Sequence, residues 1–116
     1  MKLIIAGGRN FNDYSLVKSK LDHLLANHTG VIEIVSGKAK GADSLGERYA
    51  KEHNHTVKEF PADWDQYGKK AGFMRNTQMA DYGTHLIAFW DGVSVGTKMM
   101  IGLATDKGLK VKVVRY

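Results

Sequence analysis

Cysteine is absent from the 116 residues, and proline occurs once, at Pro61. The absence of cysteine excludes disulfides and thiolate metal sites, and it is typical of proteins in a reducing compartment. No apolar run approaches the roughly 20 residues that a membrane helix requires. The run Leu3–Ala6 is also too short to be the apolar region of a secretory signal. These absences predict a soluble, cytoplasmic protein that does not associate with a membrane.

The length and the charge of the chain limit its organisation and its partners. A chain of 116 residues is expected to form one domain over residues 1–116, and no linker or repeat divides it. Lysine and arginine number 17 against 12 acidic residues, which gives a net charge of +5. This excess favours anionic partners such as nucleic acids, nucleotides or phosphates. A basic surface that only keeps the protein soluble explains the charge equally well.

Short apolar runs alternate with amphipathic segments along the chain. The segments between the runs place apolar residues at helical spacing, as Val17, Leu21 and Leu24 do. Most of the runs are continuously apolar, as expected for parallel strands buried on both faces. The alternation predicts an α/β fold with a mainly parallel sheet between two layers of helices. The predicted strands are Lys2–Ala6, Val31–Ser36, Thr56–Phe60, His85–Trp90 and Lys110–Val114.

Capping residues predict where several helices begin and end. Asn12 or Asp13 is suited to cap the first helix, and Ser44 with Glu47 matches a capping box for the second. Gly108 is expected to end the last helix. Residues 61–71 form the one long stretch without periodicity, which predicts an ordered binding loop or, alternatively, a disordered excursion.

Three glycine-rich segments follow predicted strands, at residues 7–13, 36–43 and 91–97. In an open parallel sheet, ligands bind beyond the carboxyl ends of the strands. Glycine lets the backbone approach a ligand closely, and the amino end of the next helix favours an anion. The alternative is that these glycines serve turn geometry alone. Neither a complete dinucleotide fingerprint nor a P-loop motif is present, which argues against ordinary dehydrogenases and NTPases.

Several side chains in these segments suit a phosphorylated ligand. Arg9 is placed to bind a phosphate, although a salt bridge to Asp13 or Asp43 would also explain it. Asp43 is suited either to accept hydrogen bonds from ribose hydroxyls or to cap its helix. Thr97 and the N–H groups after Gly96 form a candidate phosphate cradle, and plain helix initiation is the alternative.

Residues of the irregular stretch and of the third helix extend this set. Trp64 and Tyr67 either cover a nucleobase or pack the loop against the domain. Arg75 and Asn76 are expected early in the third helix, where a cation is unfavourable unless an anion lies close.

The sequence gives little support for metal or nucleophilic chemistry. His53 and His55 are two residues apart, with no third ligand nearby in the sequence. No Ser/His/Asp arrangement stands out. We therefore expect no metal and no cofactor. The residues alone predict a protein that binds a phosphorylated ligand.

A series of motifs in order along the chain resembles the SLOG superfamily, named for the Smf/DprA and LOG proteins, and within it the YspA-type, YpsA-related group. The resemblance extends over nearly the whole chain. The motifs are Gly7-Gly8-Arg9 with Phe11 and Asp13, Ser36-Gly37, Gly41-Ala42-Asp43, Phe60-Pro61-Ala62-Asp63-Trp64, Gly68-Lys69, Ala71-Gly72, Arg75-Asn76 with Met79, Ala88-Phe89-Trp90-Asp91-Gly92, Ser94, Gly96-Thr97 and Met100-Ile101.

The resemblance implies a Rossmann-like three-layer α/β/α sandwich with a five-stranded parallel sheet of order 3-2-1-4-5. It implies that a nucleotide or nucleotide derivative binds above the first and fourth strands, and that the protein forms a homo-oligomer. Together with the loop residues discussed above, it gives a predicted ligand-binding set. That set is Gly7, Gly8, Arg9, Phe11, Ser36, Gly37, Lys38, Gly41, Ala42, Asp43, Trp64, Arg75, Asn76, Asp91, Gly92, Ser94, Gly96 and Thr97.

Two departures from the family pattern bear on function. Lys38 stands where the group usually has a second glycine, which adds a cation but restricts the turn. The LOG branch hydrolyses nucleoside monophosphates with a glutamate, and Met100 occupies that position here. Methionine cannot transfer a proton. LOG-type hydrolysis would therefore need Asp43 or Asp91 as a substitute, and Arg9 is the remaining candidate catalytic residue.

The leading hypothesis is that the protein senses or sequesters a nucleotide-derived small molecule similar to ADP-ribose. Related domains in bacterial defence systems sense such molecules while fused to an effector. A lone domain would instead act as a phage-encoded sponge for the signal. The alternatives are a phosphoribohydrolase, or N-glycosidase, acting on nucleoside 5′-monophosphates and, less favoured, a nucleic-acid-binding domain.

Overall fold

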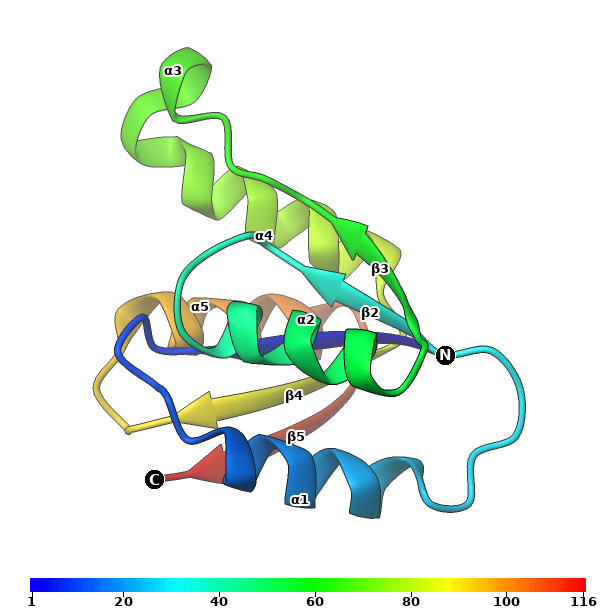
Figure 1. The fold of residues 1–116 in the computed structure, drawn as a ribbon. Helices are drawn as coiled ribbons and strands as arrows, with labels where there is room; N and C mark the ends of the chain where they lie inside the picture. Colours follow the sequence, from blue (N-terminus) through cyan, green and yellow to red (C-terminus); the bar gives the residue numbers. More distant parts are fainter.

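Five parallel strands form one sheet in the computed structural model, which describes all 116 residues (Figure 1). The order across the sheet is β3-β2-β1-β4-β5, which confirms the predicted topology. β4 has the predicted bounds, whereas β2 begins two residues later than expected, at Glu33. The strands are β1 Lys2–Gly7, β2 Glu33–Ser36, β3 Thr56–Glu59, β4 His85–Trp90 and β5 Lys110–Arg115.

Helices cover both faces of the sheet, so the three-layer sandwich is also confirmed. α1 (Tyr14–Leu25) and α2 (Ala42–Glu52) lie on one face, and α4 (Ala71–Tyr82) and α5 (Val95–Asp106) lie on the other (Figure 1). The short helix α3 (Trp64–Tyr67) lies away from the sheet, at the top of Figure 1. No helix is both long and apolar enough to cross a lipid bilayer.

Alternating residues of the central strands supply the two halves of the core. Leu3 and Ile5 pack with the α1 and α2 residues, whereas Ile4 and Ala6 pack with α4 and α5. This is the side-chain alternation of a strand that is covered on both faces, and it explains why β1 and β4 are continuously apolar. The expectation that a strand is buried on both faces is wrong for the edge strand β3, where all four residues are exposed.

The observed helix ends match those predicted from the sequence at two positions and differ at a third. Asp13 caps α1, with its Oδ1 accepting from the Leu16 N–H at 3.0 Å. Gly108 follows α5 with a positive φ of 79°, as predicted. Ser44, however, lies inside the first turn of α2, because Gly41 is the N-cap residue. Its hydroxyl donates to the Ala39 carbonyl, and the predicted capping box does not form.

The stretch 61–71 is more regular than its lack of periodicity predicted. It contains α3, a 3₁₀ turn at Gly68–Lys70 and the first residue of α4. The side chain of Asp63 accepts from the Gln66 N–H at 3.1 Å and thereby caps α3. α3 buries no residue, so no apolar stripe marked it in the sequence.

Two glycines allow the first and second glycine-rich segments to meet. A Cβ on Gly7 would lie 2.7 Å from the Cβ of Ala42 and 2.8 Å from the Phe89 carbonyl oxygen. Gly41 has a φ of +82°, and a Cβ there would overlap the Gly8 carbonyl oxygen. The loop after β1 therefore packs directly against the amino end of α2.

Replacement of Gly41 by alanine should lower the free energy of unfolding by at least about 2 kcal/mol, because a left-handed backbone strains a side chain and the new methyl group overlaps Gly8. Gly102→Ala is the matched control. Gly102 lies in α5 with open space around it, and alanine should raise stability by roughly 0.5–1 kcal/mol through helix propensity. Urea denaturation measures both. Equal stability of the two variants would contradict this packing.

Candidate functional site

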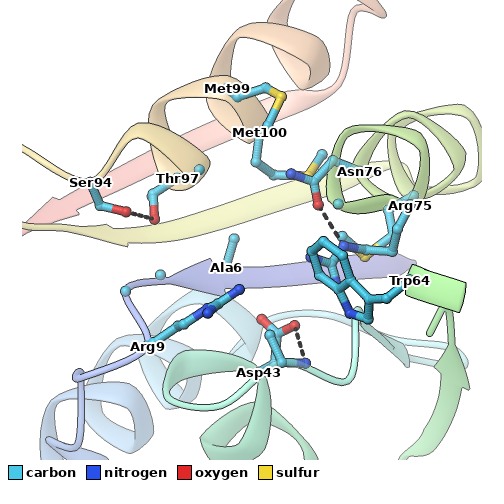
Figure 2. Close-up of a pocket in the computed structure, with 16 residues that line it drawn as sticks. Ala6, Arg9, Asp43, Trp64, Arg75, Asn76, Ser94, Thr97, Met99 and Met100 are labelled. Atoms are coloured by element: carbon cyan, nitrogen blue, oxygen red, sulfur yellow. Dashed lines mark hydrogen bonds between the residues drawn. The ribbon is translucent and has the colours of Figure 1, made fainter. Parts of the chain in front are cut away.

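A pocket of about 360 Å³ opens where the loops after β1 and β4 meet the helices (Figure 2). It lies at the carboxyl ends of the strands, which is the usual ligand position in an open parallel sheet. Its lining comes mainly from the loop after β1, from α3 and α4, and from the first residues of α2 and α5. Its lining residues are Ala6, Gly7, Gly8, Arg9, Ala39, Asp43, Trp64, Gly72, Arg75, Asn76, Met79, Ser94, Gly96, Thr97, Met99 and Met100.

Many of the predicted ligand-binding residues lie together in this pocket although they are far apart in the sequence. In Figure 2, Arg9 and Trp64 lie on either side of the carboxylate of Asp43, and Ser94 and Thr97 close another side. The predicted residues that line the pocket are Gly7, Gly8, Arg9, Asp43, Trp64, Arg75, Asn76, Ser94, Gly96 and Thr97.

The floor of the pocket is apolar and was not predicted. Ala6, Met79 and Met100 line it, and all three are buried. Met100 is only 1% exposed, so its thioether forms part of this floor, at the sequence position where the LOG pattern has a glutamate. The alternation along β1 places Ala6 on the same face as α4 and α5, and this pattern could have identified the floor.

Asp43 is the one carboxylate among the pocket residues. Its side chain is 8% exposed, and its Oδ2 accepts hydrogen bonds from the N–H groups of Gly37 at 3.1 Å and Ala39 at 3.2 Å. Burial raises the pKa of Asp43 to about 6, even though these hydrogen bonds and the charge of Arg75 favour the ionised form. Asp43 therefore holds the loop after β2 through these hydrogen bonds. It does not cap α2, although capping was one of its two predicted roles.

Arg75 holds the same loop from the opposite side. Its Nη1 donates to the Gly37 carbonyl oxygen, and its Nε donates to Asn76 Oδ1 at 2.8 Å. Burial lowers the pKa of Arg75, Asp43 opposes that shift, and the positive charge of Arg9 adds to it. Two guanidinium groups thus act on one another across the pocket, and an anion between them would relieve their repulsion.

Arg9 has no hydrogen-bond or ion-pair partner in the structure, and its side chain is exposed. The alternative salt bridges to Asp13 and Asp43 do not form. A guanidinium with all five donors free can bind a phosphate through two parallel hydrogen bonds.

The amino end of α5 presents free N–H groups to the pocket. The first three helical residues, Val95, Gly96 and Thr97, have no intrahelical acceptor for their N–H groups. Thr97 is buried at 4% exposure, and its hydroxyl lies 3.1 Å from the Ser94 hydroxyl. The dipole of the helix makes this end partly positive, and it therefore favours an anion.

Asp91 and Gly92 shape this loop from outside the pocket. Asp91 Oδ1 accepts from the N–H groups of Val93 and Ser94, both at 2.8 Å, and these bonds lower its pKa. Gly92 has a φ of +86° and packs against Arg115. The structure therefore places neither of them among the residues that line the pocket.

Other predicted site residues also have structural contacts instead of pocket positions. Phe11 lies in the core on the α1 and α2 side, with its ring 5.1 Å from Phe89 and 4.5 Å from Tyr116. Ser36 is buried and donates to Glu47 Oε2 at 2.6 Å. Gly41 and Ala42 pack beneath the loop after β1. The motif pattern identified these positions but not the direction of their side chains.

Lys38 does not supply a free cation to the pocket. Its Nζ lies 2.9 Å from Glu47 Oε1 and 3.0 Å from Glu59 Oε2, and these carboxylates raise its pKa. Its φ of +59° is the conformation for which glycine is favoured, as expected from the family pattern. Lys38 and Gly37 line a second cavity of about 610 Å³ beside the first.

The raised pKa of Asp43 gives a testable dependence of stability on pH. The folded protein holds this proton up to about pH 6, whereas an unfolded aspartate releases it near pH 3.9. Between these values the folded state binds more protons, so stability falls as the pH rises. The unfolding free energy of the wild type minus that of Asp43→Asn should fall by roughly 2–3 kcal/mol from pH 4 to pH 7. Urea denaturation at several pH values measures it, and a flat difference would contradict the assignment.

Comparisons with known proteins identify the family of the chain. Residues 1–67 match the model of the YspA, cpYpsA-related SLOG family. Gene 61 protein of Mycobacterium phage D29 is 35% identical over 117 residues, which cover 95% of this chain and 93% of the phage protein. No solved structure matches. A SLOG match indicates a nucleotide-related ligand-binding or LOG-like role. The chain belongs to the YspA, cpYpsA-related SLOG family.

Proposed function

We propose that the protein binds a nucleotide-derived small molecule similar to ADP-ribose and acts by sensing or sequestering it. The observation that carries the proposal is the convergence of an unpaired Arg9, the Arg75 guanidinium and the free N–H groups of α5 on one pocket. Three sources of positive potential with a single carboxylate opposite them suit a phosphate group.

The remaining surfaces of the pocket suit the nucleoside portion of such a ligand. Met79, Met99 and Met100 provide apolar, adaptable walls, and half-exposed Trp64 provides an aromatic face at the rim. Stacking of a base on an aromatic ring contributes roughly 1–3 kcal/mol. An apolar site with a few oriented polar groups is typical of small-molecule pockets.

Binding is favoured over LOG-type hydrolysis because the pocket has few groups that transfer protons. Glycosidic cleavage commonly uses a pair of carboxylates. Here Met100 occupies the position of the LOG glutamate, and Oδ2 of the single carboxylate, Asp43, already accepts two backbone hydrogen bonds.

The proposal predicts that the purified protein binds AMP and ADP-ribose in calorimetry and releases them intact. Arg9→Ala should weaken binding about ten- to a hundredfold, because a charge-assisted hydrogen bond contributes roughly 1.5–3 kcal/mol. Lys51→Ala removes an exposed charge on α2, away from the pocket, and should leave affinity within about twofold.

Two results would contradict this proposal. An absence of binding to every nucleotide in a panel of AMP, ADP-ribose, cyclic ADP-ribose and NAD would remove the proposed ligand class. Free base in the mixture, detected by mass spectrometry and lost in Asp43→Ala, would instead establish an N-glycosidase.

A steric substitution tests the position of the phosphate. A Cβ on Gly96 meets no protein atom within 4 Å, so Gly96→Ala should leave the fold intact. The methyl group would lie beside the free N–H groups of α5 and should weaken AMP binding by about tenfold. Gly102→Ala, in the same helix but outside the pocket, is the control. Unchanged affinity in Gly96→Ala would show that the phosphate lies elsewhere.

A further inference from the structure

A second cavity lies beside the pocket and shares its boundary. The two cavities have Arg9, Ala39, Trp64 and Arg75 in common. The first, at about 360 Å³, is at the lower end of the range of about 300–1,000 Å³ for small-molecule sites. The second measures about 610 Å³, so the site as a whole extends well beyond one compartment.

The charge of the second cavity differs from that of the first. Asp43 lines only the first cavity, and no acidic residue lines the second. Lys40 lines the second cavity alone, is exposed and has no hydrogen-bond or ion-pair partner. Lys38 is already paired with Glu47 and Glu59. Lys40 is therefore an uncompensated charge facing this space, and with the shared Arg9 it favours an anionic occupant.

Trp64 lies at the boundary and offers a surface to both cavities. Its side chain is 49% exposed, and the tip of its indole lies 3.3 Å from the position that a Cβ on Gly72 would take. In Figure 2 the indole lies beside Arg75, near Asp43. The exposed indole suits a base or sugar ring of a ligand, and the two adjacent guanidinium groups suit an anionic linker attached to that ring.

We propose that the second cavity is a subsite for the distal half of a nucleoside diphosphate ester. The inference rests on the proposed function of the first cavity. The mononucleotide half occupies the first cavity, the diphosphate lies at the boundary near Arg9 and Arg75, and the distal sugar or nucleoside lies between Trp64 and Lys40. The protein then selects two-part ligands over mononucleotides, because a mononucleotide leaves the second cavity unfilled.

Calorimetry with AMP and ADP-ribose as the two probes tests this assignment. Wild-type protein should bind ADP-ribose at least about tenfold more tightly than AMP. Lys40→Ala removes the free charge, and Asn10→Trp fills the second cavity from a residue that lines it and has no side-chain hydrogen bond. Each variant should abolish most of the preference for ADP-ribose and change AMP affinity by less than about twofold. Lys51→Ala is the charge-matched control and should keep the preference.

The outcomes separate this inference from the proposed function. Equal affinity of the wild type for AMP and ADP-ribose, or a preference that survives both Lys40→Ala and Asn10→Trp, overturns the subsite and leaves the first cavity as a nucleotide site. Failure of both probes to bind the wild type overturns the proposed function, and the subsite with it. Urea denaturation of both variants separates a loss of binding from a loss of folding.

Discussion

The arrangement of the site depends on the peptide groups on either side of Gly37. The Gly37 N–H donates to Asp43 of α2, and its carbonyl oxygen accepts from Arg75 of α4. These helices lie on opposite faces of the sheet, so one residue connects the two outer layers at the edge where the ligand would bind. A Cβ at this position would lie 2.8 Å from side-chain atoms of Arg75 and 2.9 Å from Asp43 Oδ2, so a larger residue would displace both side chains. Gly37 thus supports the shape of the site and is not itself assigned a contact with the ligand.

This connection has an energetic cost that fits a binding site. Asp43 is buried, which raises its pKa and destabilises its charged form. Arg75 is also partly buried, and its positive charge is repelled by that of Arg9. The cost at Arg75 decreases when an anion binds near the two guanidinium groups and compensates their charge, whereas the same anion further disfavours the ionised form of Asp43. Sites that are arranged in advance for a charged ligand often contain such unfavourable interactions in the free protein, and they are usually less stable for it.

Local patterns in the sequence predicted the features that depend on neighbouring residues. The apolar run within His85–Trp90 defined a central strand, and Asp13 was one of two predicted caps because the N–H group from which it accepts is only three residues away. Features that depend on contacts between residues far apart in the sequence were not predicted. Phe11 faces the core because Phe89 and Tyr116 lie there, and Glu47 bonds Ser36 instead of completing a capping box. Helix α3 buries nothing, so its residues carry no periodic pattern.

The two outer strands of the sheet explain part of the positive charge in another way. β5 has no neighbour on its far side, and Lys110, Lys112 and Arg115 are exposed along it. β3 forms the opposite margin and exposes Lys58. Unpaired strand margins invite hydrogen bonding with the margin of another molecule, and lysine there opposes such pairing by burial cost and mutual repulsion. The basic residues at these margins therefore have a second consequence: they oppose the pairing of one copy of the chain with another, margin to margin, into a continuous sheet.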